Sequence, residues 1–206
     1  MADLARYPIP AARARAELVI ERSRFLCTLA HAESPEVAHA FIKEMQGEFA
    51  DATHNCWAFV AGPPGSSARI GMSDDGEPHG TAGRPMLTVL MHAGVGEIVA
   101  VVTRYYGGTK LGTGGLVRAY SATVQEALAR LERRERVETL DVQLRLAYGA
   151  FTPVRNLLPA HEGEVVQERF GESVELVVRL PAGNVDALRA AVANATGGQG
   201  EFRIAP

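Results

Sequence analysis

The pattern of apolar and polar residues along the chain predicts a mixture of helices and strands. Apolar and polar residues alternate from 140 to 148, which is typical of a half-buried antiparallel strand. The run 98–106 is apolar almost throughout and predicts a buried strand. From Leu116 to Leu131 apolar residues return every three or four positions, so we expect a helix over 116–133.

The segment before the buried strand predicts further strands and two helices. Ser34 followed by Pro35 is typical of a helix start, and apolar residues keep a helical spacing as far as Gly47. A second helix is expected over 86–92. The strands expected in this segment are a pair meeting at a turn within 17–30, one at 54–60 and one at 68–72.

The C-terminal part has the element order of a ferredoxin-like domain. Arginines between 130 and 136 suit the end of a helix, where cations are favourable, and the alternating strand follows them. We therefore place the domain boundary near Val137, giving domains 1–136 and 137–206. The elements expected in the second domain are strands at 140–148, 164–170, 174–180 and 199–204, with helices capped by Thr152-Pro153 and over 184–194. This βαββαβ order predicts an α+β fold.

Composition and charge exclude several classes of protein. The 206 residues are 47% hydrophobic, and no run approaches the roughly 18 apolar residues of a membrane-spanning helix. The N-terminus carries no apolar signal segment, so we expect a cytoplasmic location and no membrane partner. The net charge of -3 excludes a uniformly basic nucleic-acid binder, so a nucleic-acid role would need a focused patch, and we expect no DNA specificity. Cys27 and Cys56 show no metal or disulfide spacing and are expected to be buried thiols.

A strand, a glycine-rich loop and a helix follow one another between 98 and 133, which is the outline of an anion site. Glycines allow a backbone to approach a ligand closely, and a helix starting near Gly115 or Leu116 would point unpaired N–H groups at it. The loop matches neither a Walker nor a Rossmann fingerprint. The residues expected to bind an anion or a nucleic acid are Arg84, Arg104, Tyr106, Gly107, Gly108, Thr109, Lys110, Gly112, Thr113, Gly114, Gly115 and Arg118.

An acidic turn just before this segment has two open interpretations. Asp74, Asp75 and Glu77 could hold Mg²⁺ through carboxylate oxygens. They could also form an Asp-Gly turn whose carboxylates cap backbone N–H groups and pair with Arg84 or Arg104, the interpretation we favour. Arg104 is in turn either a buried ion-pair partner or an exposed phosphate contact. No nucleophile elbow and no metal-binding histidine spacing is present, so we expect no catalytic residues and no cofactor.

Several of these motifs together resemble the bacterial YigZ branch of the IMPACT family. The resemblance covers essentially the whole chain and rests on residues 54–57, 74–78, 80–83, 104–108 and 111–117. It implies an N-terminal domain like the second domain of a small-subunit ribosomal protein and a ferredoxin-like C-terminal domain. It also implies a link to translation, since the eukaryotic IMPACT protein regulates initiation, and it implies no established reaction.

The sequence therefore predicts a non-catalytic binding protein in translation control. We expect a phosphate-rich partner, RNA or the ribosome, at residues 104–118, with translation-related proteins as further partners. Two alternatives stay open. One is a metal-assisted phosphate-ester or nucleotide enzyme that uses the acidic turn, and the other is a protein-interaction module in which the glycine loop is structural.

Overall fold

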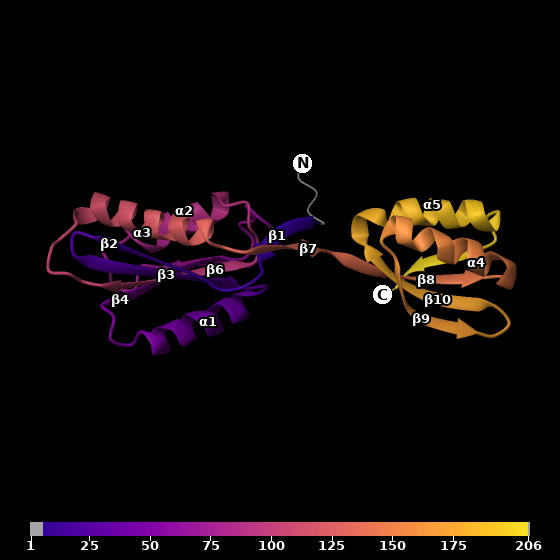
Figure 1. Ribbon diagram of the computed structural model, residues 1–206, viewed down its shortest axis with the longest axis horizontal. Coiled ribbons are helices and arrows are strands. Elements are labelled where there is room, and N and C mark those ends of the chain that lie inside the picture. Colours follow the sequence, from indigo (N-terminus) through magenta and orange to yellow (C-terminus); the bar gives the residue numbers. More distant parts are fainter. Residues whose placement is uncertain (1–5, 206) are drawn as a thin grey trace. The chain divides into compact units, whose positions relative to one another are not determined.

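The computed structural model describes residues 6–205, which divide into two compact units (Figure 1). Residues 7–136 form one unit, and Arg6 groups with 137–205 in the other. The guanidinium of Arg6 forms an ion pair of 2.5 Å with Glu162 of the same unit. Within the described residues, no helix is long and apolar enough to span a membrane.

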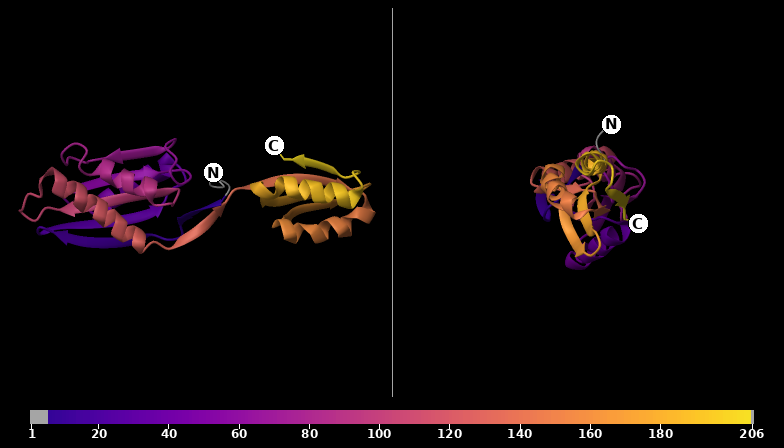
Figure 2. Two further views of the ribbon diagram at one scale, coloured as in Figure 1. Left: turned by 90° about the horizontal axis from the view of Figure 1, so that it is seen from above. Right: turned by 90° about the vertical axis from the view of Figure 1, so that its right-hand side faces the viewer.

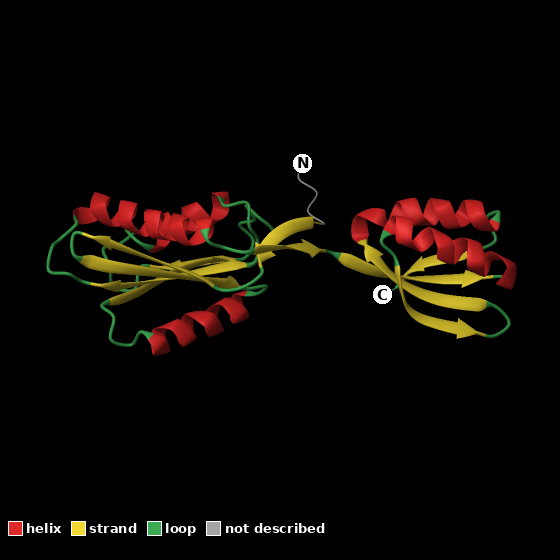
Figure 3. Cartoon of the chain, in the orientation of Figure 1, coloured by secondary structure: helices red, strands yellow, loops and turns green. Residues whose placement is uncertain are grey.

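The N-terminal unit is a five-stranded antiparallel sheet with helices on both faces (Figures 1 and 3). Helix α1 (Pro35–Glu48) packs on one face, and α2 (Gly83–His92) and α3 (Gly112–Ala129) cover the other. The strands, in spatial order, are β2 (Ala14–Ile20), β3 (Ser23–His31), β6 (Ile98–Tyr105), β4 (His54–Val60) and β5 (Ile70–Ser73). The predicted buried strand is thus confirmed as the central one.

The C-terminal unit has the predicted ferredoxin-like order and topology. Its four strands lie in the order β11-β8-β10-β9, and α4 and α5 lie side by side on one face (Figures 1 and 2). The bounds are β8 (Thr139–Leu146), α4 (Tyr148–Leu157), β9 (Glu164–Phe170), β10 (Val174–Pro181), α5 (Val185–Thr196) and β11 (Glu201–Ile204). Short 3₁₀ turns occupy Leu158–His161 and Ala182–Asn184.

Two helix predictions are wrong at their ends. Helix α3 begins three residues before Gly115 and stops at Ala129, and the arginine run continues as strand β7 (Arg133–Val137), which pairs with β1 (Arg6–Pro10). The arginines of this run suit a helix C-terminus, so the local sequence predicts a helix end. Its strand partner lies far away in sequence and leaves no local signal. Helix α4 begins at Tyr148, so Pro153 lies inside the helix and not at its start.

Candidate functional site

The acidic turn is held by backbone hydrogen bonds to Asp74. One carboxylate oxygen accepts the N–H of Gly80 at 2.7 Å, and the other accepts those of Ala82 at 3.0 Å and Gly83 at 2.8 Å. Burial alone would raise the pKa of Asp74, but these hydrogen bonds outweigh it and hold the pKa below its usual range. Because Ala82 at the start of α2 offers no side-chain cap, Asp74 caps the helix from outside it.

Asp75 also binds backbone, and it forms no ion pair with any arginine that the structure describes. Its carboxylate accepts the N–H of Asn55 at 2.6 Å, and its carbonyl lies 2.7 Å from the Nδ1 of His54. Asp75 and Gly76 both have positive φ, at 44° and 85°, so the chain reverses here in the left-handed region that favours an Asp-Gly sequence. The side chain is exposed, which corrects the idea that Asp75 is a buried partner of an arginine.

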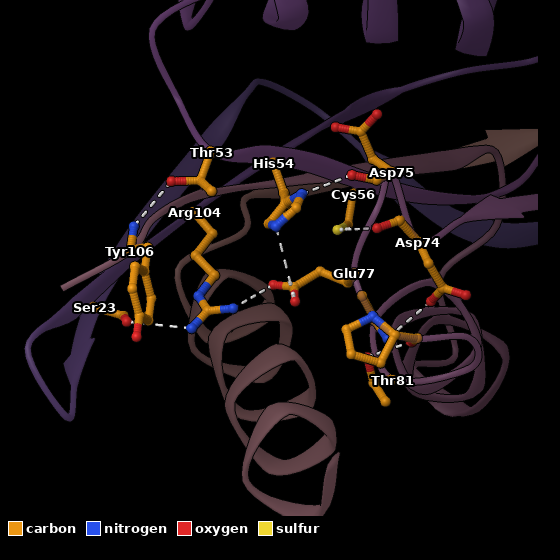
Figure 4. Close-up of polar contacts among 12 residues, drawn as sticks. Ser23, Thr53, His54, Cys56, Asp74, Asp75, Glu77, Thr81, Arg104 and Tyr106 are labelled. Atoms are coloured by element: carbon orange, nitrogen blue, oxygen red, sulfur yellow. Dashed lines mark hydrogen bonds and ion pairs between the residues drawn. The ribbon is translucent and has the colours of Figure 1, made fainter. Parts of the chain in front are cut away.

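Glu77 is the centre of a buried polar network (Figure 4). Arg104 donates to one of its oxygens at 2.6 Å, the Tyr120 hydroxyl donates to the same oxygen at 2.8 Å, and His54 lies 4.0 Å from the other. Arg104 is only 5% exposed. It is therefore a desolvated ion-pair partner, and the alternative of an exposed phosphate contact does not describe it.

Aromatic rings enclose the rest of the Arg104 side chain. Its guanidinium carbon lies 5.2 Å from the centre of the Phe25 ring and 5.5 Å from that of Tyr106. One guanidinium nitrogen donates to Ser23 Oγ at 3.3 Å, while the buried Nε has no hydrogen-bond partner among the described residues. Cation–π contacts stabilise a guanidinium in such a setting. Tyr106, which is 46% exposed, covers the arginine from the solvent side.

The neighbouring thiol and phenol are held in their neutral forms. Burial raises the pKa of the Cys56 thiol and that of the Tyr120 hydroxyl. Cys56 lies 3.3 Å from the Tyr120 hydroxyl and 2.9 Å from the Asp74 carbonyl. A neutral buried thiol is a poor nucleophile, so the network has the character of a structural core. Among residues 6–205, no group of three or more histidine, cysteine or acidic side chains is placed to hold a metal ion.

The glycine loop is attached to this network at its first glycine. Gly107 donates its N–H to Ser23 Oγ at 3.2 Å, the same oxygen that Arg104 contacts. A Cβ at Gly107 would lie 2.0 Å from the carbonyl oxygen of Arg22, so only glycine fits against the β2–β3 turn. The positive φ values of the loop occur at Gly108 and Gly112, at 88° and 69°. Gly114 lies in the first turn of α3 and has no positive φ.

The cations of the loop border a shallow groove of about 380 Å³. Lys110 and Arg118 line it together with Glu21, and neither cation forms an ion pair with a described residue. A Cβ added at Gly114 would lie 3.6 Å from the guanidinium of Arg118. The Arg118 side chain therefore reaches back over the first turn of α3. That turn has no side-chain cap. The remaining lining residues are Ile20, Thr109, Leu111, Gly115, Ala119 and Ala122.

The structure does not bring all the predicted site residues together. Thr109, Lys110, Gly115 and Arg118 line the groove, whereas Arg104 is buried in the Glu77 network. Arg84, exposed at the start of α2, does not line the groove. Thr113 and Gly114 are exposed in the first turn of α3.

Arg22 was not predicted as a site residue. This exposed cation sits at the turn between β2 and β3, directly against Gly107. The packing of the β2–β3 turn on the glycine loop brings Arg22 to this position. No local pattern in the sequence predicts that contact.

Comparison with known proteins shows where the chain belongs. Residues 21–128 match the Impact N-terminal domain, and residues 144–199 match a domain of unknown function, DUF1949. The chain belongs to the IMPACT family. It is 45% identical over 186 residues to the IMPACT family member YigZ of Escherichia coli (strain K12), covering 90% of this chain and 91% of that protein.

Two further comparisons support this membership. An IMPACT family member of Haemophilus influenzae is 40% identical over 196 residues, which is 95% of each chain. The crystal structure of a hypothetical protein is 42% identical, covers 98% of both chains and superposes with a TM-score of 0.70. The predicted family resemblance is therefore confirmed.

Proposed function

We propose that this IMPACT family protein is a non-catalytic binding protein that contacts the phosphates of RNA, as free RNA or within the ribosome, through the groove beside the glycine loop. The observation that carries the proposal is a pair of cations, Lys110 and Arg118, that have no ion-pair partner among residues 6–205 and share one groove with an uncapped helix start. Cations without protein partners near a helix N-terminus favour an anion at that place.

The arrangement favours a polyanion over a single small ligand. Arg22, exposed on the turn that touches Gly107, adds a third cation beside the loop. Cations spread along an open groove suit the successive phosphates of a nucleic-acid backbone. Tyr106, which directly precedes Gly107 in the chain, is exposed enough for its ring to stack on a base. The family resemblance supports the further proposal that this binding serves translation.

The metal-assisted alternative has no observation in its favour. Each carboxylate of the acidic turn already holds protein donors: Asp74 and Asp75 bind backbone N–H groups, and Glu77 binds Arg104 and Tyr120. These contacts give the three carboxylates a role inside the fold.

The test is a salt titration of RNA and ribosome binding by the wild type and by Lys110→Ala and Arg118→Ala. Each variant should weaken binding by a similar factor for different RNA sequences and lower the log–log salt slope by about one unit or less. Lys43→Ala is the matched control, because Lys43 is an exposed cation on α1, on the opposite face of the sheet. Equal binding by all four proteins, with the fold intact by circular dichroism, would remove the groove from the function.

A further inference from the structure

One face of the sheet in the C-terminal unit is covered by helices, and the other is polar. α4 and α5 pack on the face that carries Val142, Leu144, Leu176 and Val178, all of them buried. The residues that alternate with these point to the opposite face. That face contains a hollow of about 380 Å³. Within the described part of this unit, no helix lies on that face (Figure 3).

Charges on this uncovered face alternate in sign from strand to strand. The strand register places four side chains in one row across the sheet, in the order Glu201, Arg145, Glu175, Arg169. A second row, at the position four residues before Arg145 in β8, has the order Asp141, Arg179, Glu164. Each charge in these rows therefore has an opposite charge as its cross-strand neighbour. Between the two rows lie Arg203, Gln143, Val177 and Gln167.

Only some of these opposite charges form ion pairs within the sheet. Asp141 and Arg179 form an ion pair of 2.8 Å, which is the ordinary stabilising use of opposite cross-strand charges. In the first row, however, Arg145, Glu175 and Arg169 form no ion pair with any described residue. Arg145 instead donates its Nε–H to Ser173 Oγ at 2.9 Å. The centre of the uncovered face thus carries charges that have no ion-pair partner among the described residues and are available to another molecule.

We propose that this face binds the same face of a second copy of the chain. A two-fold axis parallel to the strands, between β8 and β10, places each β8 opposite β10 of the other copy. Arg145 then faces Glu175 of the partner subunit, Glu201 faces the partner's Arg169, and Asp141 faces the partner's Arg179. No like charges meet in either row. A surface that is its own complement in this way suits the isologous contact of a two-fold dimer.

A second copy fits this face better than a nucleic acid does. The lining of the hollow includes the acids Glu175 and Glu201 among its arginines, so the surface is not a cationic track. The aromatic cluster of this unit, Tyr148, Phe151 and Phe170, involves α4, which packs on the other face. Because the contact is built from charges and has little apolar area, the dimer should be weak and sensitive to salt.

The experiment is sedimentation velocity of the full chain over a range of protein concentrations at low and high salt. The wild type should shift towards a dimer with increasing concentration at low salt and should dissociate at high salt. Arg145→Glu should weaken the dimer by about tenfold or more, because it opposes Glu175 of the partner subunit with a like charge. The swap Arg145→Glu with Glu175→Arg should restore the dimer, since positions 145 and 175 again carry opposite charges both within each sheet and between the two copies. Only the outer neighbours Glu201 and Arg169 then meet a like charge within the sheet.

Lys43→Glu on α1 is the matched control, since it changes the net charge equally and lies in the other unit. Three results would overturn the proposal: a wild type that stays monomeric at low salt, an Arg145→Glu variant that associates like the control, or a charge swap that does not recover association. If Arg145→Glu fails to fold, Arg169→Glu takes its place, because it opposes Glu201 of the partner subunit with a like charge. None of these results depends on RNA binding.

Discussion

The acidic turn and the glycine loop contain charges of opposite sign in opposite situations. Glu77 is buried between Arg104 and Tyr120, and Asp74 accepts three backbone N–H groups. Lys110 and Arg118 border a groove and have no ion-pair partner among the described residues. Charges whose partners lie inside the fold stabilise it, whereas charges without partners are available to a ligand. The acidic turn therefore stabilises the fold, and the unpaired charges of the loop are the ones that we propose bind a ligand.

The largest effect should come from removing the charge of Glu77. Glu77→Gln leaves Arg104 buried without its counter-ion, and breaking a buried ion pair from one side costs about 3–5 kcal/mol. The free energy of unfolding, measured with urea, should fall by that amount. In the double variant Glu77→Gln with Arg104→Met, part of the loss should be recovered because no buried charge remains. A loss below about 1 kcal/mol for the single variant would show that the Arg104 charge is solvated.

The next effect tests where the loop and the network meet. In Gly107→Ala the new Cβ would lie 2.0 Å from the carbonyl oxygen of Arg22, so the backbone must move, at a cost of about 1–3 kcal/mol. Gly108→Ala is the matched control, since Gly108 has open space around it and only its φ of 88° is unfavourable. We expect a loss of about 1–2 kcal/mol there, and a larger loss for Gly107→Ala, where a close backbone contact adds to the cost. Equal urea midpoints for the two variants would contradict the close contact between Gly107 and the β2–β3 turn.

The sequence predicts the elements well where periodicity is strong and fails where pairing is distant. The alternation around Leu140 and the buried run 98–106 locate two strands, because each pattern reports burial directly. The arginine run gives no such signal, since Arg133–Val137 becomes a strand through its pairing with Arg6–Pro10, over a hundred residues away.

The same limit applies to the candidate site. Spacing indicates that Lys110 and Arg118 lie near one helix start, and the structure places both in one groove. Spacing alone left Arg104 undecided between a buried and an exposed role, because its partner Glu77 is 27 residues away and the enclosing Phe25 ring comes from another strand. Arg22 reaches the loop only through the packing of the β2–β3 turn.

Asp74→Asn should have an intermediate effect that depends on pH. The amide keeps one acceptor oxygen but turns an NH₂ group towards an N–H donor, so we expect a loss of about 1–2 kcal/mol at neutral pH, as for a helix cap. The folded pKa of Asp74 is lowered, so its contribution is present above the unfolded pKa and is lost as pH falls through the folded pKa. Urea unfolding at pH 7 and at about pH 3 should therefore show a smaller difference between wild type and variant at the lower pH. A difference that does not change with pH would contradict the role of the charge.

The smallest effect on stability should come from the cations of the groove. Neutralising both residues, as Lys110→Gln with Arg118→Gln, should change the free energy of unfolding by no more than about 0.5 kcal/mol, as for surface substitutions without structural contacts. A slight gain at low salt is expected, because Arg22 lies beside the same loop and like charges repel less once two are removed. Urea unfolding at low and high salt measures both quantities. The same variant should lose affinity for RNA by more than either single substitution. A loss of stability above about 1 kcal/mol would mean that these cations hold the fold together, and a fall in affinity could then no longer be assigned to lost phosphate contacts.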